Sequence, residues 1–360
     1  MHLLINTGGG DAPGLNAVIR AVTLTAIRRG FRVTGVRRGY SGLLADFPGG
    51  LVPLTRDSVR GIAERGGTIL GTVNKGSPFE YPVTHANGTT QLEDVSDRLV
   101  ENFRATGADG LIALGGDGSL RIALRLMQKG IPIIGVPKTI DNDLAATEST
   151  FGFDTAMSFA CDSVGRLHST AEAHSRVMVV EVMGRHAGWI ALFAGIAGAA
   201  NVILLPEVDF DIDKVCATIR HRYETERPFA IVVVAEGAKP LGGEQLVTRR
   251  EIAKEATLGG VGAWVADEIA RRTGYETRSL VLGHLQRGGS PTPFDRVLAM
   301  RYGAAAVRFA AEGAWGNMVS YAPPHMSRVP IADAVAKTRT VPADHDALAT
   351  ARDLGICLGD

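Results

Sequence analysis

The sequence predicts an α/β protein in which parallel strands alternate with helices in two domains. Short apolar runs are followed by glycine-rich turns and then by segments of helical length, and this order recurs in both halves of the chain. The chain has 360 residues, of which 45% are hydrophobic, so it is long enough for two separate cores. Because no low-complexity linker interrupts it, we expect the two domains to be closely joined.

In the first half, an apolar run predicts a buried strand, and the turn Gly8–Gly14 leads from it into a helix. The predicted elements of this half are strands at 3–6, 31–36, 110–114 and 131–136 and helices at 15–29 and 119–129. Gly30 and Gly130 stand where glycine ends a helix. A strand, a helix and a further strand in this order form a right-handed unit with parallel strands.

The second half repeats this order. Its predicted elements are strands at 177–182, 202–205, 229–235 and 280–282 and helices at 189–199, 250–272 and 294–312. The segment Lys75–Gln91 is rich in Pro, Gly, Asn and Thr, and we expect a long loop there, near a cleft. The pattern weakens from about Ser327 onward.

Composition and charge narrow the class of protein. The 38 basic and 38 acidic residues cancel, which argues against a nucleic-acid partner. The cysteines at 161, 216 and 357 are odd in number and far apart, which favours reduced thiols over disulfides or a zinc site. No apolar run reaches the roughly 18 residues that cross a membrane. We therefore expect a cytoplasmic protein with neither nucleic-acid nor membrane partners.

In open α/β sheets, ligands bind beyond the carboxyl ends of the strands. In this sequence, three predicted strands are each followed by a distinctive loop. In the first, Gly8–Gly14, free backbone amides and a helix N-terminus suit a phosphate. This loop has neither the spaced Gly-x-Gly-x-x-Gly pattern nor a Walker ending, and such a turn is often only a tight connection.

Carboxylates follow the next two strands. Asp117 lies in the loop before Ser119 and is suited either to bind Mg²⁺ or to shape a turn that Ser119 caps. Asp141 and Asp143 follow the very next strand, so we expect them near Asp117. Converging carboxylates need a cation, an arginine or a proton. We therefore expect Asp117 to bind Mg²⁺ and one of the other two to accept a proton from a hydroxyl of the substrate.

The second half supplies basic residues near strand ends: Arg176, Arg185, Arg278, His284 and Arg287. Each alone is more often a surface residue, but arginine suits phosphate, and the set predicts a sugar-phosphate pocket. Glu236 ends a strand, where it either binds sugar hydroxyls or faces water.

These motifs, taken in order, resemble the phosphofructokinase family as far as about residue 325. The segments that carry the resemblance are GGDAPGLN (9–16), GGDGS (115–119), PKTIDND (137–143), EVMGR (181–185) and GHLQRGGSP (283–291). The resemblance implies a phosphotransferase, 6-phosphofructokinase, which acts in glycolysis on the 1-hydroxyl of fructose 6-phosphate.

The resemblance also implies roles for single residues. Asp141 is the base, Thr139 and Asp143 shape its site, Arg185 steadies charge on the phosphoryl group, and Asp117 ligates Mg²⁺. The residues expected at the donor are Gly9, Asn74, Lys75, Gly116, Asp117, Gly118 and Ser119. Those expected at fructose 6-phosphate are Thr139, Asp141, Arg176, Met183, Gly184, Arg185, Glu236, Arg278, His284 and Arg287.

The family organisation implies two Rossmann-like three-layer domains with mainly parallel sheets and the active site in the cleft between them. The donor-binding domain comprises residues 1–152 plus 286–336, and the fructose 6-phosphate-binding domain comprises 153–285 plus 337–360. Arg176 and Arg278 match positions that reach into a neighbouring subunit's site. We therefore expect a homodimer or homotetramer with shared active sites.

Donor choice is where the motifs conflict. Pyrophosphate users usually carry an acidic residue at the position of Gly118, and glycine leaves room for ATP. Lys138, in contrast, is typical of pyrophosphate users. ATP-dependent relatives usually place an arginine where this chain has Asn74, and Lys75 supplies only a point charge. Gly118 together with Lys138 resembles the mixed branch of the family, in which ATP-dependent members carry both features, and we therefore favour ATP as the donor.

Three alternatives remain open at this point. The first is a reversible enzyme that uses pyrophosphate, which donor assays separate from an ATP-dependent one. The second is a catalytically silent regulatory subunit, against which the intact Asp117, Asp141 and Asp143 argue. The third is a dinucleotide-dependent oxidoreductase, which would leave Asp141 without a role.

Overall fold

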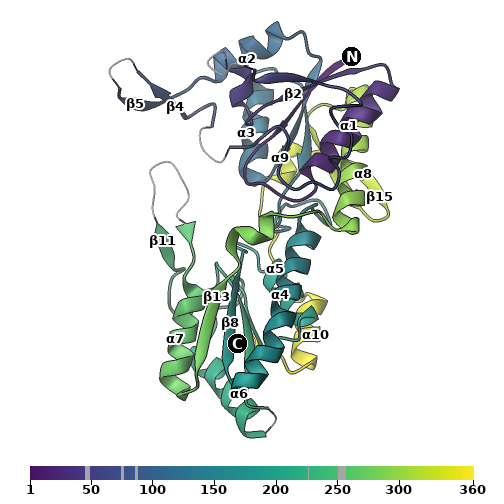
Figure 1. Ribbon diagram of the computed structural model, residues 1–360. Helices are drawn as coiled ribbons and strands as arrows, with labels where there is room; N and C mark the ends of the chain where they lie inside the picture. Colours follow the sequence, from purple (N-terminus) through teal and green to yellow (C-terminus); the bar gives the residue numbers. More distant parts are fainter. Residues whose placement is uncertain (45–48, 74–76, 86–87, 226, 250–256) are drawn as a thin grey trace. The chain divides into compact units, whose positions relative to one another are not determined.

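The computed structural model describes residues 1–44, 49–73, 77–85, 88–225, 227–249 and 257–360 (Figure 1). It divides into two compact units. Unit 1 comprises Met1–Ile140, Leu144–Asp154 and Arg287–Thr338, and unit 2 comprises Asp141–Asp143, Thr155–Gln286 and Arg339–Asp360. The chain therefore passes between the units several times, and each unit is described by itself.

Unit 1 is built around a large, mainly parallel sheet. Its strands are β1 (His2–Thr7), β2 (Arg32–Val36), β3 (Leu51–Leu54), β6 (Gly110–Gly115), β7 (Ile133–Pro137), β14 (Asn317–Ala322) and β15 (His325–Pro330). Its helices are α1 (Leu15–Arg28), α2 (Ser96–Ala105), α3 (Asp117–Gln128), α8 (Pro293–Ala311) and α9 (Ile331–Ala334), with the short helix η1 (Ser41–Leu43). The order is β15-β14-β7-β6-β1-β2-β3, and the two edge strands are antiparallel to their neighbours.

Both faces of this sheet are buried, which makes three layers. Leu3 and Ile5 of β1 pack in one core with residues of α1 and α8, whereas Leu4 packs in a second core with residues of α2 and α3. The alternation follows from the period of two along a strand. A run of apolar residues on both faces is what a covered parallel strand requires.

Unit 2 has a smaller, parallel sheet in the order β13-β8-β10-β9. Its strands are β8 (Val177–Val182), β9 (Val202–Leu204), β10 (Ala230–Ala235) and β13 (Thr277–Val281), with the separate pair β11 (Val247–Arg249) and β12 (Thr257–Leu258). Its helices are α4 (Phe153–His174), α5 (Trp189–Ala197), α6 (Ile212–Thr225), α7 (Val261–Thr273) and α10 (Asp346–Asp353), and η2 (Gly283–Arg287) follows β13. Residues of α6 and α7 share one core with the sheet, and α5 packs on Ile203. The α/β fold with mainly parallel sheets is confirmed.

The helix predicted at 250–272 begins later than expected. Residues 250–256 lie outside the described part of the chain, Thr257–Leu258 form a strand, and α7 starts only at Val261. The carboxylate of Glu181 accepts hydrogen bonds from the backbone N–H groups of Gly260 and Gly262, at 3.1 and 2.8 Å. An acceptor at these first amides, together with the left-handed Gly260, fixes where the helix begins.

The long loop predicted at Lys75–Gln91 is in part a hairpin. Strands β4 (Tyr81–Thr84) and β5 (Thr90–Glu93) pair in antiparallel fashion, and Figure 1 shows them extending away from the sheet of unit 1. Residues 74–76 and 86–87 lie outside the described residues. Each strand has only four residues, and β5 is mostly exposed, so the alternation of Tyr81 and Val83 in β4 is too short to predict a strand.

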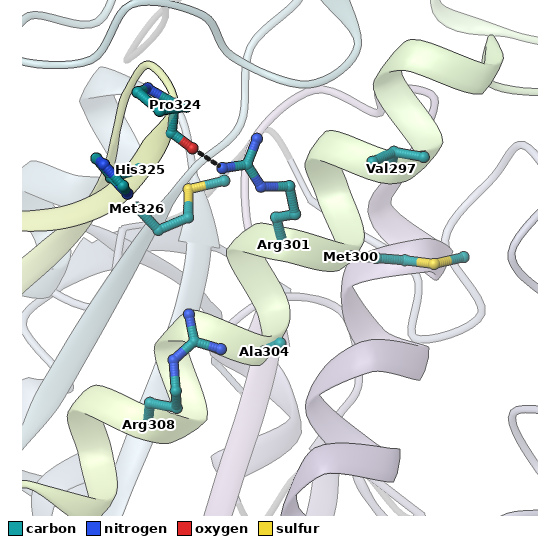
Figure 2. A pocket seen from close by; sticks show the side chains of 8 residues that line it. All are labelled: Val297, Met300, Arg301, Ala304, Arg308, Pro324, His325 and Met326. Atoms are coloured by element: carbon teal, nitrogen blue, oxygen red, sulfur yellow. Dashed lines mark hydrogen bonds between the residues drawn. The ribbon is translucent and has the colours of Figure 1, made fainter.

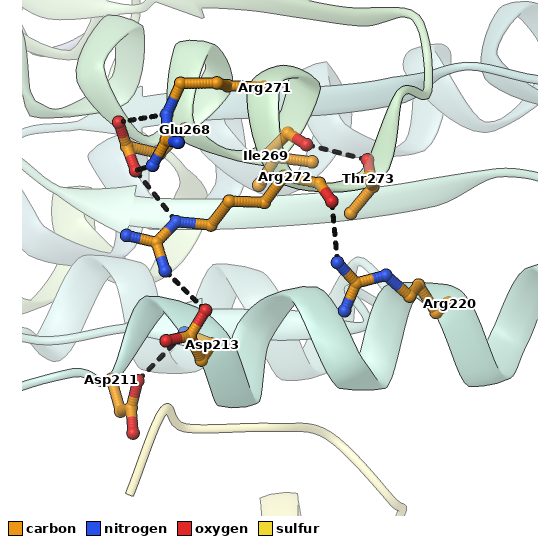
Figure 3. A network of polar contacts seen from close by, with 8 residues as sticks. All are labelled: Asp211, Asp213, Arg220, Glu268, Ile269, Arg271, Arg272 and Thr273. Atoms are coloured by element: carbon orange, nitrogen blue, oxygen red, sulfur yellow. Dashed lines mark hydrogen bonds and ion pairs between the residues drawn. The ribbon is translucent and has the colours of Figure 1, made fainter.

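An ion-pair network joins α6 to α7 in unit 2 (Figure 3). The Glu268 carboxylate accepts hydrogen bonds from Arg271 Nη2 and Arg272 Nε, both at 2.8 Å. Arg272 also pairs with Asp213, and its backbone carbonyl accepts a bond from Arg220 Nη2 at 2.6 Å. Hydrogen bonds from the two arginines lower the pKa of Glu268 to about 2.

This lowered pKa predicts an acid-dependent loss of stability. The contribution of Glu268 is complete above its ordinary pKa of 4.5 and is lost as the pH falls toward about 2. Thermal unfolding of Glu268→Gln should therefore show a lower Tm than the unchanged protein near pH 7, and the difference should shrink below pH 4.5. Glu244→Gln, an exposed carboxylate of unit 2 outside the network, is the control. A Tm difference that does not change with pH would contradict this assignment.

No helix among the described residues is both long enough and apolar enough to cross a membrane.

Candidate functional site

The glycine loop after β1 lies beside the ends of the neighbouring parallel strands in unit 1. The N–H of Gly8 donates to the carbonyl of Leu114 at 2.8 Å, and the N–H of Lys138 donates to the carbonyl of Gly115 at 2.9 Å. The residues that follow β1, β6 and β7 therefore lie together at the carboxyl edge of one sheet. This is the edge at which open α/β sheets bind their ligands.

Close packing explains the glycines of this loop. A Cβ atom on Gly8 would lie 2.8 Å from Ser119 Oγ, and one on Gly9 would lie 3.1 Å from the same oxygen. The helices α1 and α3 begin after Gly14 and Gly116, and no described side chain caps either N-terminus. The first-turn amides of both helices are thus available to an anion.

Two cations stand beside the loop. Lys138 is only 3% exposed, and its Nζ donates to the carbonyl of Gly10 at 2.5 Å. Arg287 Nη1 donates to the carbonyl of Asp11 at 3.3 Å. Arg287, which the sequence assigned to the sugar-phosphate set, therefore lies on the first glycine loop in unit 1. The positive charges of Lys138 and Arg287 add to the partial positive charges at the N-termini of α1 and α3, and together they favour the binding of phosphate beside this loop.

Asn16 and Thr72 also support this loop. Asn16 ends the GGDAPGLN segment, but neither residue was assigned a role from the sequence. The side-chain amide of Asn16 donates to the carbonyls of Arg65 and Gly67, at 2.9 and 2.8 Å. Thr72 Oγ1 donates to the carbonyl of Gly9 at 2.5 Å. These bonds hold the segment after residue 65 beside the glycine loop. Asn74 and Lys75, expected at the donor, lie outside the described residues.

Asp117 is the expected metal ligand. It is the first residue of α3, its side chain is 41% exposed, and it accepts a hydrogen bond from Arg121 Nε at 2.9 Å. No group of three or more His, Cys, Asp or Glu side chains in the described part of the chain is arranged to hold a metal ion. Because Mg²⁺ is often held by one or two carboxylates together with substrate phosphates and water, an accessible Asp117 fits this role once Arg121 is displaced.

Gly118 and the segment around Thr139 differ in how tightly they are packed. A Cβ atom on Gly118 would meet nothing within 4 Å, so this position opens onto free space. Thr139 is 9% exposed, and its carbonyl accepts a bond from Thr150 Oγ1 at 2.8 Å. The chain that leads into the aspartates is therefore held firmly, while Gly118 leaves room beside α3.

The segment Asp141–Asp143 belongs to unit 2. Its central residue, Asn142, is 5% exposed and has a left-handed backbone with φ 52°. The carbonyl of Asn142 accepts a bond from Arg339 Nη1 at 3.2 Å, and the carbonyl of Asp143 accepts one from the Arg339 N–H at 2.8 Å. No motif in the sequence predicted a role for Arg339.

The loop after β8 is braced by the loop after β10. Gly184 has φ 140°, and its carbonyl accepts a bond from the Gly237 N–H at 3.1 Å. Gln245 Nε2 donates to the carbonyls of Arg185 and Gly237, at 3.2 and 2.8 Å. Met183–Arg185 and Glu236 therefore lie at the carboxyl edge of the unit 2 sheet. Exposed His284 follows β13 at the same edge.

Arg176 and Arg278 lie at the opposite edge of this sheet. Both contact the Glu276 carboxylate, at 2.8 and 2.7 Å, and hydrogen bonding to Arg176 lowers the pKa of Glu276. Arg176 precedes β8 and Arg185 follows it, so the six residues of β8 separate them by roughly 20 Å. Within unit 2 of one chain, Arg176 and Arg278 therefore lie far from Arg185.

A separate pocket lies on the outer side of α8 in unit 1 (Figure 2). Its volume is about 480 Å³, and it is lined by Val297, Met300, Arg301, Ala304, Arg308, Pro324, His325 and Met326. Arg301 Nη2 donates to the carbonyl of Pro324 at 2.5 Å. Of the residues expected at the donor or the acceptor, none that the structure describes lines this pocket, so it is distinct from the loops described above.

Comparison with known proteins gives consistent results. A family model described as Phosphofructokinase matches residues 2–310. An ATP-dependent 6-phosphofructokinase of Chloroflexus aggregans is 48% identical over 98% of this chain and 96% of that protein. A pyrophosphate--fructose 6-phosphate 1-phosphotransferase of Amycolatopsis mediterranei is also 48% identical, over 96% of this chain and 97% of that protein. The crystal structure of Pichia pastoris phosphofructokinase in the T-state is 31% identical with a TM-score of 0.80, and this chain covers 37% of that longer chain.

Proposed function

Because this chain belongs to the phosphofructokinase family, we propose that it transfers the γ-phosphoryl group of ATP to the 1-hydroxyl of fructose 6-phosphate, giving fructose 1,6-bisphosphate. The observation that supports the proposal is the arrangement of groups at the carboxyl edge of the unit 1 sheet. There a glycine loop, two uncapped helix N-termini and the cations Lys138 and Arg287 come together. Such an arrangement suits the phosphates of a donor.

We assign donor binding to unit 1 and acceptor binding to unit 2. In unit 1, Gly9 and Gly116–Ser119 offer backbone amides and a hydroxyl to the phosphates. Asp117 would hold Mg²⁺, which when bound offsets the negative charge of the donor phosphates. In unit 2, Met183–Arg185, Glu236 and His284 lie at the carboxyl edge, where a sugar phosphate would find an arginine for its charge and a carboxylate for its hydroxyls.

Proton transfer is assigned to the segment after β7. Asp141 accepts the proton of the 1-hydroxyl as the hydroxyl oxygen bonds to the γ-phosphorus, which makes that oxygen a better nucleophile. The bond between the γ-phosphorus and the β,γ-bridging oxygen breaks, and ADP leaves. Thr139 and Asp143 shape the surroundings of Asp141. Arg185 stabilises the negative charge on the transferred group, a role that suits a guanidinium because it stays charged.

Gly118 supports ATP as the donor. Its position is exposed and opens onto free space, so nothing there opposes the α-phosphate of a nucleotide. Lys138 Nζ donates to the Gly10 carbonyl, which places its charge beside the glycine loop. The second candidate function is a reversible transfer from pyrophosphate. It is favoured by Lys138 and by the 48% identity to the Amycolatopsis enzyme.

The positions of Arg176 and Arg278 support shared active sites. Their charges lie at the edge of the unit 2 sheet away from Arg185, where they cannot serve the acceptor of the same chain. A second copy of the chain is therefore proposed to receive them, in a homodimer or homotetramer.

The acceptor chemistry tests this function. Purified protein with Mg²⁺ and ATP should convert fructose 6-phosphate to fructose 1,6-bisphosphate, detected by coupling to aldolase. The analogue 1-deoxyfructose 6-phosphate, which lacks the attacked hydroxyl, should give no transfer, and chelation of Mg²⁺ should abolish it. If fructose 1,6-bisphosphate forms with neither ATP nor pyrophosphate, the assignment is overturned.

Gly237→Ala should weaken use of the acceptor. A Cβ atom there would lie 2.0 Å from the carbonyl oxygen of Arg185, and backbone cannot give way as a side chain does. We expect kcat/KM for fructose 6-phosphate to fall by about tenfold or more, because small displacements of positioning groups are costly. Gly165→Ala, in open space on α4, is the matched control. A folded Gly237→Ala variant with unchanged kcat/KM would show that the Arg185 loop does not hold the acceptor.

A further inference from the structure

The segment that carries Asp141 has a backbone conformation that needs outside support. Asn142 is left-handed, with φ 52°, and is 5% exposed. Non-glycine residues in this region persist where the surrounding structure fixes them, and they cluster at functional sites. In this chain the support comes from a residue almost two hundred positions later, at the start of the C-terminal segment of unit 2.

Arg339 contacts the segment at two consecutive carbonyls. Its Nη1 donates to the Asn142 carbonyl at 3.2 Å, and its backbone N–H donates to the Asp143 carbonyl at 2.8 Å. Because a peptide group is planar, fixing the Asn142 carbonyl fixes the plane that joins it to Asp143. Arg339 thereby restricts the backbone torsions of the residue that follows Asp141.

The Arg339 side chain is itself held in place. Its guanidinium carbon lies 4.4 Å from the centroid of the Trp189 ring, and Trp189 Nε1 donates to the Arg339 carbonyl at 3.1 Å. Trp189 is 2% exposed and stacks on Phe193, with His345 edge-on at 5.1 Å. A planar cation over a fixed aromatic face keeps its direction better than a flexible ammonium does.

The residues that follow Arg339 are held at the N-terminus of α5. The Val341 N–H donates to the Glu207 carboxylate at 2.8 Å, and that carboxylate also accepts from the Gly188 N–H at 2.9 Å. Gly188 immediately precedes Trp189 and the start of α5. One carboxylate therefore ties the segment after Arg339 to the N-terminus of the helix on which its guanidinium rests.

We propose that Arg339 is a positioning residue that sets the direction of the Asp141 carboxylate. The inference rests on the proposed function, in which Asp141 accepts the proton of the sugar hydroxyl. We assign Arg339 a role through the backbone, because its bonds to this segment go to the carbonyls of Asn142 and Asp143. It acts by holding the Asn142–Asp143 peptide group and the next one along the chain. A displacement of about 1 Å in a positioning group can cost about a hundredfold in rate.

The test compares Arg339→Ala and Arg339→Lys with a matched control. Lysine keeps the charge and the aliphatic stem but loses the planar fork. Lys337→Ala removes an exposed cation two residues earlier in the chain. In Arg339→Ala we expect kcat to fall by about 10- to 100-fold with KM for fructose 6-phosphate within about threefold of the unchanged protein. Arg339→Lys should show the same pattern to a smaller extent, and Lys337→Ala should show neither change.

A double variant shows whether the effect passes through Asp141. If Arg339 acts only by directing that carboxylate, Arg339→Ala added to Asp141→Asn should lower kcat no further than Asp141→Asn alone. Full additivity would overturn the proposal, as would unchanged kcat in a folded Arg339→Ala. A rise in KM with kcat unchanged would instead assign Arg339 to substrate binding and would also overturn it.

The folding of each variant is checked by thermal unfolding. If Arg339→Ala does not fold, the split between kcat and KM in Arg339→Lys decides the question. Failure of the proposed function looks different: the unchanged protein would then form no fructose 1,6-bisphosphate. Failure of the inference leaves the activity of the unchanged protein in place, with one of the overturning results above in the folded Arg339 variants.

Discussion

Asp141→Asn is expected to lower kcat by about two to four orders of magnitude while substrate affinity stays nearly unchanged. Asparagine keeps the shape of the side chain but cannot accept the proton of the sugar hydroxyl. The bonds from Arg339 to this segment go to the backbone carbonyls of Asn142 and Asp143, so the replacement leaves them intact. Single-turnover formation of fructose 1,6-bisphosphate measures the chemical step directly, and KM reports on binding.

Asp143→Asn is the matched comparison, because it removes a carboxylate from the same segment. We expect it to lower kcat less than Asp141→Asn does, since Asp143 shapes the site without taking the proton. An Asp141→Asn variant with near-normal turnover would remove Asp141 as the base. A larger loss in Asp143→Asn would move the role of base to that residue.

Gly118→Asp is expected to reduce kcat/KM for ATP by about a hundredfold and to affect pyrophosphate much less. Two like charges about 4 Å apart repel by about 4 kcal/mol near a protein surface, more than enough for such a change. The effect should not come from misfolding. A Cβ atom at Gly118 meets nothing within 4 Å, and an acidic residue in the first turn of α3 is favourable to the helix.

Gly118→Asn separates charge from bulk, because asparagine has nearly the same size without the charge. If repulsion of the α-phosphate sets donor choice, Gly118→Asn should retain more ATP activity than Gly118→Asp. The ratio of kcat/KM for the two donors is the quantity to measure. The same ratio in Gly118→Asp and in the unchanged protein would exclude this position from donor choice.

The central parallel strands were predictable because they are buried on both faces. Strands such as β6 and β10 are buried at every position and therefore read as unbroken apolar runs. The long helix α4 was missed for the opposite reason. It is rich in small and polar residues, and only a few of its 22 residues are buried. The tail after Ser327 was unexplained because the short α9 and α10 leave little periodic pattern.

The candidate site also contains features that could be predicted from the sequence and features that could not. Loops that use side chains or glycines for a purpose, such as Gly8–Gly14, could be found from the sequence. Contacts through backbone carbonyls could not, because no side-chain motif records them. This is why Arg339 and Asn16 were missed. Arg176 and Arg185 both lie near a strand end in the sequence, but they flank opposite ends of β8. The direction and length of this strand therefore separate them.

The most direct test of the account is formation of fructose 1,6-bisphosphate from fructose 6-phosphate and Mg²⁺, with ATP and pyrophosphate supplied in parallel at matched concentrations. The account predicts a higher kcat/KM with ATP, which would show that the open position at Gly118 outweighs the presence of Lys138. Activity mainly with pyrophosphate would contradict it. The chain would then be a reversible pyrophosphate-dependent enzyme in which Lys138 marks the donor.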